Sequence, residues 1–227
     1  MARGDLGAAA GVRVRLWDAP IRLVHWLLVG LIAFAWWSRK DHLDWHRWAG
    51  YAVLGLVIFR VYWGFAGAGA ARFASFVKGP RATLAYLATV PRRTPSGTPG
   101  HNPLGALSIL AILVALALQT VTGLFAVDVD GIESGPLSDR VSFETGRRLA
   151  ELHEQAFTAL EALIALHVAA VLFYLVWKRT DLVGPMITGR RTFARDPGYP
   201  ATPRWRLALG VALAAAAAWF VSKGLKL

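Results

Sequence analysis

Six histidines are the residues of this sequence whose type and spacing are best suited to chemistry. They are His25, His42, His46, His101, His153 and His167. A histidine inside an apolar segment is energetically costly unless it has a partner, and imidazole is both a metal ligand and a proton carrier. Four of the six lie within or at the ends of long apolar segments. The first hypothesis is therefore a cofactor site or a proton pathway inside those segments.

His153 and His167 are predicted to lie on one face of one helix, because 14 residues separate them. At 100° and 1.5 Å per residue, 14 steps return to within about 40° of the starting direction and advance about 21 Å. His25 begins the first apolar segment at the depth of His167, and His46 begins the second at the depth of His153. The sequence thus predicts two facing histidine pairs, one above the other.

Facing imidazoles at equal depth are what bis-histidine ligation of haem iron requires, with the porphyrin held edge-on in a helix bundle. The absence of cysteine excludes disulfides, thiolate-bound zinc, iron–sulfur clusters and covalently attached haem. A zinc site would need three or four clustered ligands, and a proton relay gives no reason for matched depths. We therefore predict two haems b, on His25/His167 and His46/His153, and keep a metal or proton pathway as the alternatives.

Further residues are candidates for contacts with these cofactors. Gly50 follows His46 by one turn on the same face, where a missing side chain admits either the macrocycle edge or a neighbouring helix. Arg60 shares that face 14 residues after His46 and is predicted to pair with a haem propionate, the alternative being snorkelling to the headgroups. His101 and Asn102 precede the third apolar segment and either border a quinone headgroup or cap that helix.

Three other polar residues near the histidines are assigned no cofactor role. His42 lies one turn before His46 and outside the apolar segment, so we expect an exposed loop residue. Glu161 and Gln119 lie at mid-membrane depth, and Glu161 is about 100° away from the histidine face of its helix. Interhelical hydrogen bonding is the expectation for both.

The elements that must position these residues are membrane-spanning helices. Of the 227 residues 56% are hydrophobic and 17% charged, with a mean hydropathy of +0.44, and a span needs about 20 apolar residues. Five spans are predicted: Ile21–Trp37, Arg47–Phe65, Leu104–Val127, Leu152–Trp177 and Leu207–Ser222. The expected fold class is all-α, an integral membrane four-helix bundle with a fifth C-terminal helix. The expected domains are a segment 1–20, a di-haem domain 21–190, and a linker with the fifth helix, 191–227.

Basic residues predict the orientation of the chain. The N-terminal segment, the second loop and the segment after the fourth span contain four, five and seven Lys and Arg, whereas the first and third loops contain three each. The positive-inside rule places the first group in the cytoplasm of a bacterial inner membrane, with the N-terminus inside. The net charge of +11 is then topological and lipid-facing, and it requires no nucleic-acid partner.

Several short motifs resemble those of one family. The motifs are Trp17-Asp-Ala-Pro-Ile-Arg-Leu-Val-His-Trp26, His46-Arg-Trp-Ala-Gly-Tyr51, Gly100-His-Asn-Pro-Leu-Gly105, Glu151-Leu-His-Glu154 and Leu166-His-Val168. Over about residues 15–190 the sequence resembles the bacterial cytochrome b561 family, which belongs with the membrane subunits of nickel–iron hydrogenases among the di-haem cytochromes b. The resemblance implies a four-helix core with two haems b. It also implies axial histidines on helices one, two and four, which match His25, His46, His153 and His167.

The function expected from these features is electron transfer between the quinone pool and a periplasmic partner such as a c-type cytochrome. Two alternatives stay open. In the first alternative, the chain is a superoxide oxidase that passes electrons to ubiquinone. Arg39, Lys40 and Arg47 would then form a basic entrance for the superoxide anion. In the second alternative, the chain is the cytochrome b subunit that anchors a hydrogenase or dehydrogenase. The expected partners are therefore membrane lipids, quinone or quinol, and one redox protein.

Overall fold

A computed structural model of the chain describes residues 11–94, 100–130 and 133–225. Within those residues five helices are long and apolar enough to cross a membrane, which confirms the predicted all-α membrane bundle with a fifth helix. They are α1 (Ala19–Ser38), α2 (Leu43–Ala66), α5 (Pro103–Phe125), α6 (Phe143–Val176) and α8 (Arg204–Ser222). The first ten residues, which include one of the arginines counted above, lie outside the described part.

Polar caps fix where the helices begin. Asp18 caps α1, its Oδ1 accepting a hydrogen bond from the backbone N–H of Ile21 at 3.0 Å, and Asn102 caps α5 in the same way. Ser142 caps α6, so that helix begins nine residues before the predicted Leu152. The additional turns are polar, and a prediction based on apolar residues alone therefore missed them.

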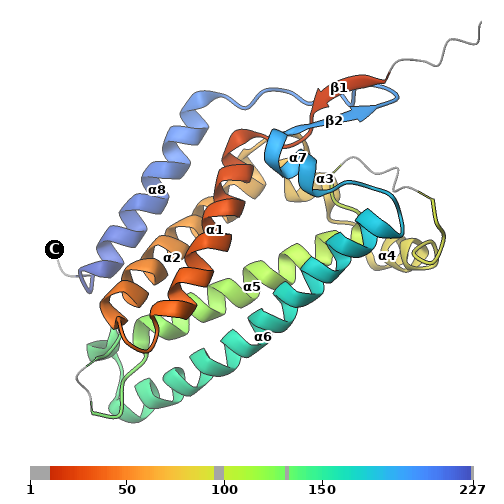
Figure 1. The fold of residues 1–227 in the computed structure, drawn as a ribbon. Helices are drawn as coiled ribbons and strands as arrows, with labels where there is room; N and C mark the ends of the chain where they lie inside the picture. The colour runs from red at the N-terminus through yellow and green to blue at the C-terminus, as the bar shows by residue number, and fades with distance from the viewer. Residues whose placement is uncertain (1–10, 95–99, 131–132, 226–227) are drawn as a thin grey trace, which may run out of the picture.

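Helix α2 is at the centre of the packing, in contact with α1, α5 and α8, while α6 packs chiefly on α5 (Figure 1). Small residues allow α8 to lie close to α2. A Cβ added at Gly55 would come within 3.3 Å of the carbonyl oxygen of Ala214, and one at Gly210 within 2.6 Å of the ring of Tyr62. The fifth helix is therefore an integral part of the bundle, held by the close small-residue packing that is common in membranes.

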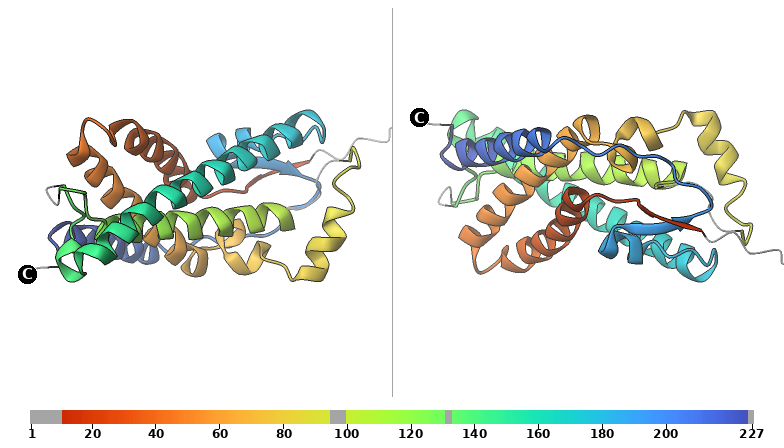
Figure 2. Two further views of the ribbon diagram at one scale, coloured as in Figure 1. Left: turned by 90° about the horizontal axis from the view of Figure 1, so that it is seen from below. Right: turned by 90° about the horizontal axis from the view of Figure 1, so that it is seen from above.

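A two-stranded antiparallel sheet lies at one end of the bundle and was not predicted. Strand β1 (Val12–Arg15) pairs with β2 (Arg190–Phe193), which follows the short helix α7 (Val183–Thr188). Figure 2 shows this sheet at the opposite end from the C-terminus of α8. We call this the sheet end, and the end with the α1–α2 loop the hairpin end. The sheet joins the segment before α1 to the segment after α6.

The remaining elements are short and lie in the loops. They are η1 (Gly69–Ala71), α3 (Phe73–Phe76), α4 (Pro80–Leu87) and η2 (Ser138–Arg140). Helix α4 is tied to the end of α6, because the buried Lys178 donates from Nζ to the carbonyl oxygens of Thr89 and Arg92, at 3.0 and 2.6 Å. The long second loop is thus ordered structure against the bundle over its described residues, where the sequence analysis expected only a connection.

Two apolar cores stabilise the bundle. One lies toward the sheet end, where Trp17, Ile21 and Val24 pack with Phe59 and Trp63. The other lies in the middle of the bundle and combines side chains of α2, α5 and α6: Val53, Val57, Leu116 and Leu160. Lipid is as apolar as these side chains, so close van der Waals packing between the helices, and not removal from water, is what lets these cores fix how the histidine-bearing helices face one another.

Candidate functional site

His46 of α2 and His153 of α6 face one another at the hairpin end. Their ring centroids are 6.0 Å apart and the ring planes are inclined by 80°. Metal–imidazole bonds are about 2 Å long, so one metal atom bound between two imidazoles separates their centroids by about 6 Å. The spacing of this pair fits the prediction that both rings bind one metal atom. Because the two helices are contributed by different hairpins, no local sequence pattern could fix this distance.

Backbone carbonyls set which nitrogen of each ring is available. The Nδ1 atom of His46 lies 2.9 Å from the carbonyl oxygen of Ala35, and Nδ1 of His153 lies 2.9 Å from that of Gln119. A carbonyl oxygen only accepts, so Nδ1 carries the proton in both rings and donates it. Nε2 is left with a lone pair, which in His153 accepts from the side-chain amide of Gln119. This is the arrangement that holds metal-ligating histidines in a fixed orientation.

Residues of α5 complete the surroundings of His153. The side-chain amide nitrogen of Gln119 lies 3.0 Å from His153 Nε2, which confirms the interhelical hydrogen bond expected for Gln119. A Cβ added at Gly123 would come within 2.8 Å of Cε1 of His153, so a larger residue here would displace the imidazole ring. Sequence reasoning missed Gly123. The available signal was a glycine in the interior of an apolar helix, a position that usually has a packing or functional reason.

Open space lies beside Gly50, one turn after His46. A Cβ added there would meet no heavy atom within 4 Å. Close packing against a neighbouring helix, the alternative role for this glycine, would fill that space. The geometry therefore agrees with the prediction that Gly50 leaves room for a planar group next to His46.

A second polar cluster lies toward the sheet end and contains His25, His101, His167 and Arg60. His25 interacts electrostatically with His167, and His101 interacts with both of them and with Arg60. The Nδ1 atom of His25 is buried without a hydrogen-bond partner among the described residues, and its ring lies edge-on to Trp26 at 4.9 Å. The structure thus places the first predicted pair within range of each other's charge and adds a third histidine nearby.

His101 is enclosed by aromatic rings. The ring centroids of Trp17 and Phe76 lie 4.7 and 4.9 Å from that of His101, and its Nδ1 is buried without a partner in the described part of the chain. Burial, and then the positive charge of Arg60, lower the pKa of His101 to about 3. His101 is therefore neutral at pH 7 and keeps one ring nitrogen as an acceptor. Asn102 differs, because its side-chain oxygen already accepts from Gly105 N–H at 2.8 Å.

Arg60 is a buried cation, only 7% exposed, although it lies in a membrane-spanning helix. Its guanidinium lies 5.0 Å above the ring of Phe73, and its Nη1 has no hydrogen-bond partner among the described residues. This burial excludes the snorkelling alternative. Asp18 is an acidic neighbour of Arg60, but Nη1 stays unsatisfied, and a second carboxylate such as a haem propionate would satisfy it.

An apolar layer separates the two histidine clusters. Leu160 is seven residues from His153 and seven from His167, is 1% exposed, and packs with the other three residues of the middle core. Glu161 beside it is exposed and has no hydrogen bond within the described residues, so the interhelical bond expected for it is not found. His42 is exposed, as predicted, and stacks on Trp45 at 4.5 Å.

The described residues contain no group of three or more His, Asp and Glu side chains placed to hold one metal ion. This disfavours the zinc alternative on geometry. The structure offers instead two positions where imidazoles from different helices lie at matched depth, each with unsatisfied polar atoms nearby: Gln119 Oε1 at the hairpin end, and Nδ1 of His25, Nδ1 of His101 and Nη1 of Arg60 toward the sheet end. These observations fit, at each position, a cofactor that has polar groups at its edge.

Comparisons with known proteins agree with this geometry. The family model described as prokaryotic cytochrome b561 matches residues 16–189. A curated protein of Azotobacter chroococcum mcd 1, named "Probable Ni/Fe-hydrogenase B-type cytochrome subunit", is 26% identical over 231 aligned positions, which cover 81% of this chain and 90% of that protein. No solved structure matches the chain significantly.

Proposed function

This chain belongs to the prokaryotic cytochrome b561 family, whose members are membrane cytochromes b that transfer electrons, and we propose on that premise that it binds two b-type haems. His46 and His153 would hold one haem, and His25 and His167 the other. The observation that carries this proposal is the His46/His153 pair, with 6.0 Å between ring centroids and both Nε2 atoms left without a proton.

The residues around each pair have defined tasks in this proposal. The carbonyl oxygens of Ala35 and Gln119 orient the rings of His46 and His153 and hold the proton on Nδ1. Gly50 leaves space beside His46, and Arg60 would pair with a propionate of the haem held by His25 and His167. Bound haem supplies one-electron redox chemistry. The apolar layer around Leu160 offers no hydrogen-bonding side chain between the two clusters, so it would oppose proton transfer from one cluster to the other.

We place the quinone or quinol site beside His101, toward the sheet end. A quinol hydroxyl donates a hydrogen bond, so a headgroup site needs a neutral nitrogen or oxygen that accepts one. His101 is neutral at pH 7 and has a buried, unpartnered Nδ1 within a ring of aromatic side chains. Asn102, the other residue suggested by the sequence, is occupied as the cap of α5 and only borders this position.

For the redox partner we favour a hydrogenase or dehydrogenase subunit over a c-type cytochrome. This rests on the similar Azotobacter protein, which is named as a hydrogenase cytochrome subunit. The superoxide alternative is weakened by one contact: Arg47, part of the proposed basic entrance, is ion-paired with Asp44 at 2.5 Å. We further propose the inner membrane as location, with the sheet end in the cytoplasm. Co-purification with a large subunit, and the rate of haem reduction by superoxide in stopped flow, distinguish these partners.

A haem count with single-histidine variants tests the core of the proposal. We expect about two haems b per chain by the pyridine haemochrome assay, and about one in each of His25→Ala, His46→Ala, His153→Ala and His167→Ala. His42→Ala is the matched control, because it lies one turn from His46 but is exposed. It should keep both haems. A count that is the same in His46→Ala and His42→Ala would refute the assignment of the hairpin-end pair.

A further inference from the structure

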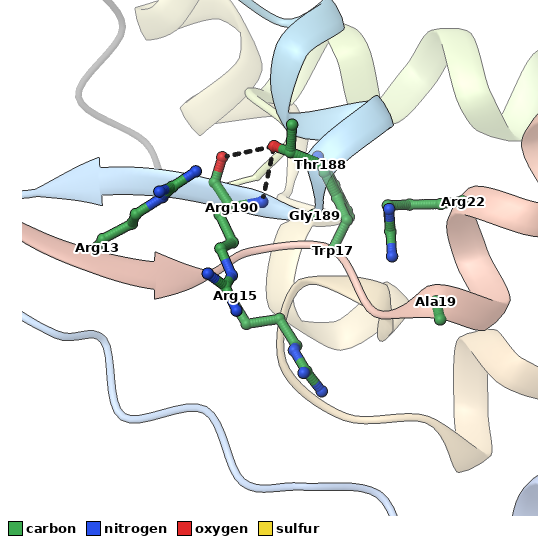
Figure 3. Close-up of a pocket in the computed structure, with 8 residues that line it drawn as sticks. All are labelled: Arg13, Arg15, Trp17, Ala19, Arg22, Thr188, Gly189 and Arg190. Carbon is green, nitrogen blue, oxygen red and sulfur yellow. Dashed lines mark hydrogen bonds between the residues drawn. The ribbon is translucent and has the colours of Figure 1, made fainter.

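Four arginines line one cavity of about 310 Å³ at the sheet end. Arg13 and Arg15 come from β1, Arg190 from β2 and Arg22 from the first turns of α1. Figure 3 shows how these elements place the arginines around the junction at Gly189. Among the residues that the structure describes, none that lines the cavity is acidic. The lining of the cavity therefore carries four positive charges.

The pairing of the strands holds like charges together. Arg13 and Arg15 are two residues apart in β1 and so point to the same face of the sheet. Arg15 is directly opposite Arg190 in the register of the two strands. Like charges in that relation destabilise a sheet. None of the four arginines has an ion pair with an acidic side chain in the described part of the chain, whereas Arg191, on the other face of β2, has Asp181 as an acidic neighbour.

Arg22 is fixed in position and still has an unused donor. Its Nη1 donates to the carbonyl oxygen of Ile187, while its Nε is buried and has no partner among the described residues. A buried N–H is normally satisfied by protein, water or a ligand. The side chain is therefore pre-oriented, and a hydrogen-bond acceptor in the cavity would satisfy it.

The backbone around the cavity is closely packed. The carbonyl oxygen of Gly189 accepts from the N–H groups of Leu16 and Trp17, at 2.8 and 3.2 Å. Gly189 has φ +77°, and a Cβ there would come within 2.8 Å of the carbonyl oxygen of Trp17 and 3.0 Å of Arg22 Nε. Only glycine fits this junction, which locks β2 onto the start of α1. The arginines therefore project from a rigid frame.

We propose that this cavity binds a phosphate group. Guanidinium groups match phosphate oxygens in pairs of parallel hydrogen bonds, and a bound anion would offset the repulsion between Arg15 and Arg190. The phosphate has two sources: the headgroup of an anionic phospholipid and a soluble phosphate compound. Ala19, which also lines the cavity, is the first residue of a membrane-spanning helix, so the cavity lies where lipid headgroups are found. The proposal does not depend on the haem assignment.

Occupancy of the cavity would connect β1 and β2 to the start of α1. Arg22 is three residues before His25 on that helix. Binding of the phosphate therefore stabilises the part of the bundle that positions one candidate cofactor ligand.

Stability and lipid retention of the intact protein test the proposal. The variants are Arg15→Gln and Arg190→Gln, and the control is Arg191→Gln, the next residue in β2 but on the opposite face. Retained phosphatidylglycerol and phosphatidylcholine are counted by native mass spectrometry. The thermal unfolding midpoint is measured in zwitterionic detergent with sodium phosphate or with sodium chloride of equal ionic strength.

We expect the wild type and Arg191→Gln to retain phosphatidylglycerol about tenfold better than Arg15→Gln or Arg190→Gln. In chloride, Arg190→Gln should unfold at a higher temperature than the wild type, because a repulsion is removed. With the anion bound, the order should reverse. If phosphatidylglycerol is retained but phosphate does not raise the thermal midpoint, the ligand is a lipid headgroup. If phosphate raises the midpoint but no lipid is retained, the ligand is a soluble phosphate compound. If neither ligand separates Arg190→Gln from Arg191→Gln, the cavity is no phosphate site.

Discussion

Replacing Gly50 by alanine distinguishes a haem beside His46 from empty or lipid-filled space. Gly50 is inside α2, and a Cβ there meets nothing within 4 Å. Alanine is about 0.8–1.0 kcal/mol more favourable than glycine in a helix interior. From the protein atoms alone, Gly50→Ala should therefore stabilise the protein by about that amount. A haem in the space reverses the sign, because the new methyl group occupies part of its position.

Gly30→Ala is the matched control. Gly30 is inside α1, also has no heavy atom within 4 Å of an added Cβ, and lies about 140° from His25 around the helix. The gain in helix propensity is the same at both positions, so the difference between the two variants isolates the contact with the cofactor. We expect Gly30→Ala to keep both haems and to unfold at a slightly higher temperature than the wild type.

For Gly50→Ala we expect loss of one haem, or release of it at a lower temperature. A tenfold weaker retention corresponds to about 1.4 kcal/mol, which exceeds the gain in propensity. The assay is the pyridine haemochrome count combined with the Soret absorbance during heating, recorded for both variants and the wild type in the same detergent. If Gly50→Ala behaves like Gly30→Ala, with both haems kept and a raised midpoint, the haem does not lie beside Gly50 and the hairpin-end assignment fails.

Three further predictions follow from individual contacts. Gly123→Ala places a Cβ 2.8 Å from His153 Cε1, so it should shift or weaken one haem band in the reduced-minus-oxidised spectrum. Gly105→Ala is the control: its Cβ would lie 3.5 Å from the nearest atom, so the spectrum should not change. The pKa of His101 is lowered from 6.5 to about 3 in the folded protein, so between pH 3 and pH 6.5 this histidine is protonated in the unfolded chain but not in the folded one. Stability should rise with pH over that window, and His101→Gln should flatten the dependence of the thermal midpoint on pH; equal slopes would contradict this. Trp63→Phe removes the 2.8 Å hydrogen bond from Nε1 to Oδ2 of Asp18 and should lower the free energy of unfolding by about 1.5–3 kcal/mol, measured against the exposed Trp205→Phe, which should change it little.

The number of spans and the residues that share one face of a helix follow from local chemistry. About 20 apolar residues are needed to cross a bilayer, so five such segments predict five helices. The 14-residue spacing of His153 and His167 places both on one face, because helix geometry is the same in any protein. Helix ends were less predictable. Ser142 begins α6 two polar turns before its apolar stretch, and hydropathy does not register those turns.

The residues that sequence reasoning missed are those whose roles depend on contacts between distant segments. Gly123 leaves room for the ring of His153, 30 residues later, and the acceptor for His46 is a carbonyl of α1, a group that every residue has. Arg60 is covered by Phe73, which belongs to the four-residue helix α3. A helix this short shows no periodic pattern of apolar residues in the sequence.

What the sequence by itself determined is the membrane class, the five spans, the two histidine depths and the candidate contacts at Gly50 and Arg60, since these depend on composition and on the geometry of one helix at a time. Tertiary structure decided the rest. It set the 6.0 Å between His46 and His153, it enclosed His101 beside the first pair, and it joined β1 to β2 so that Arg15 faces Arg190. The physical reason is that packing between helices and pairing between distant strands depend on many weak contacts at once, which no local pattern of residues specifies.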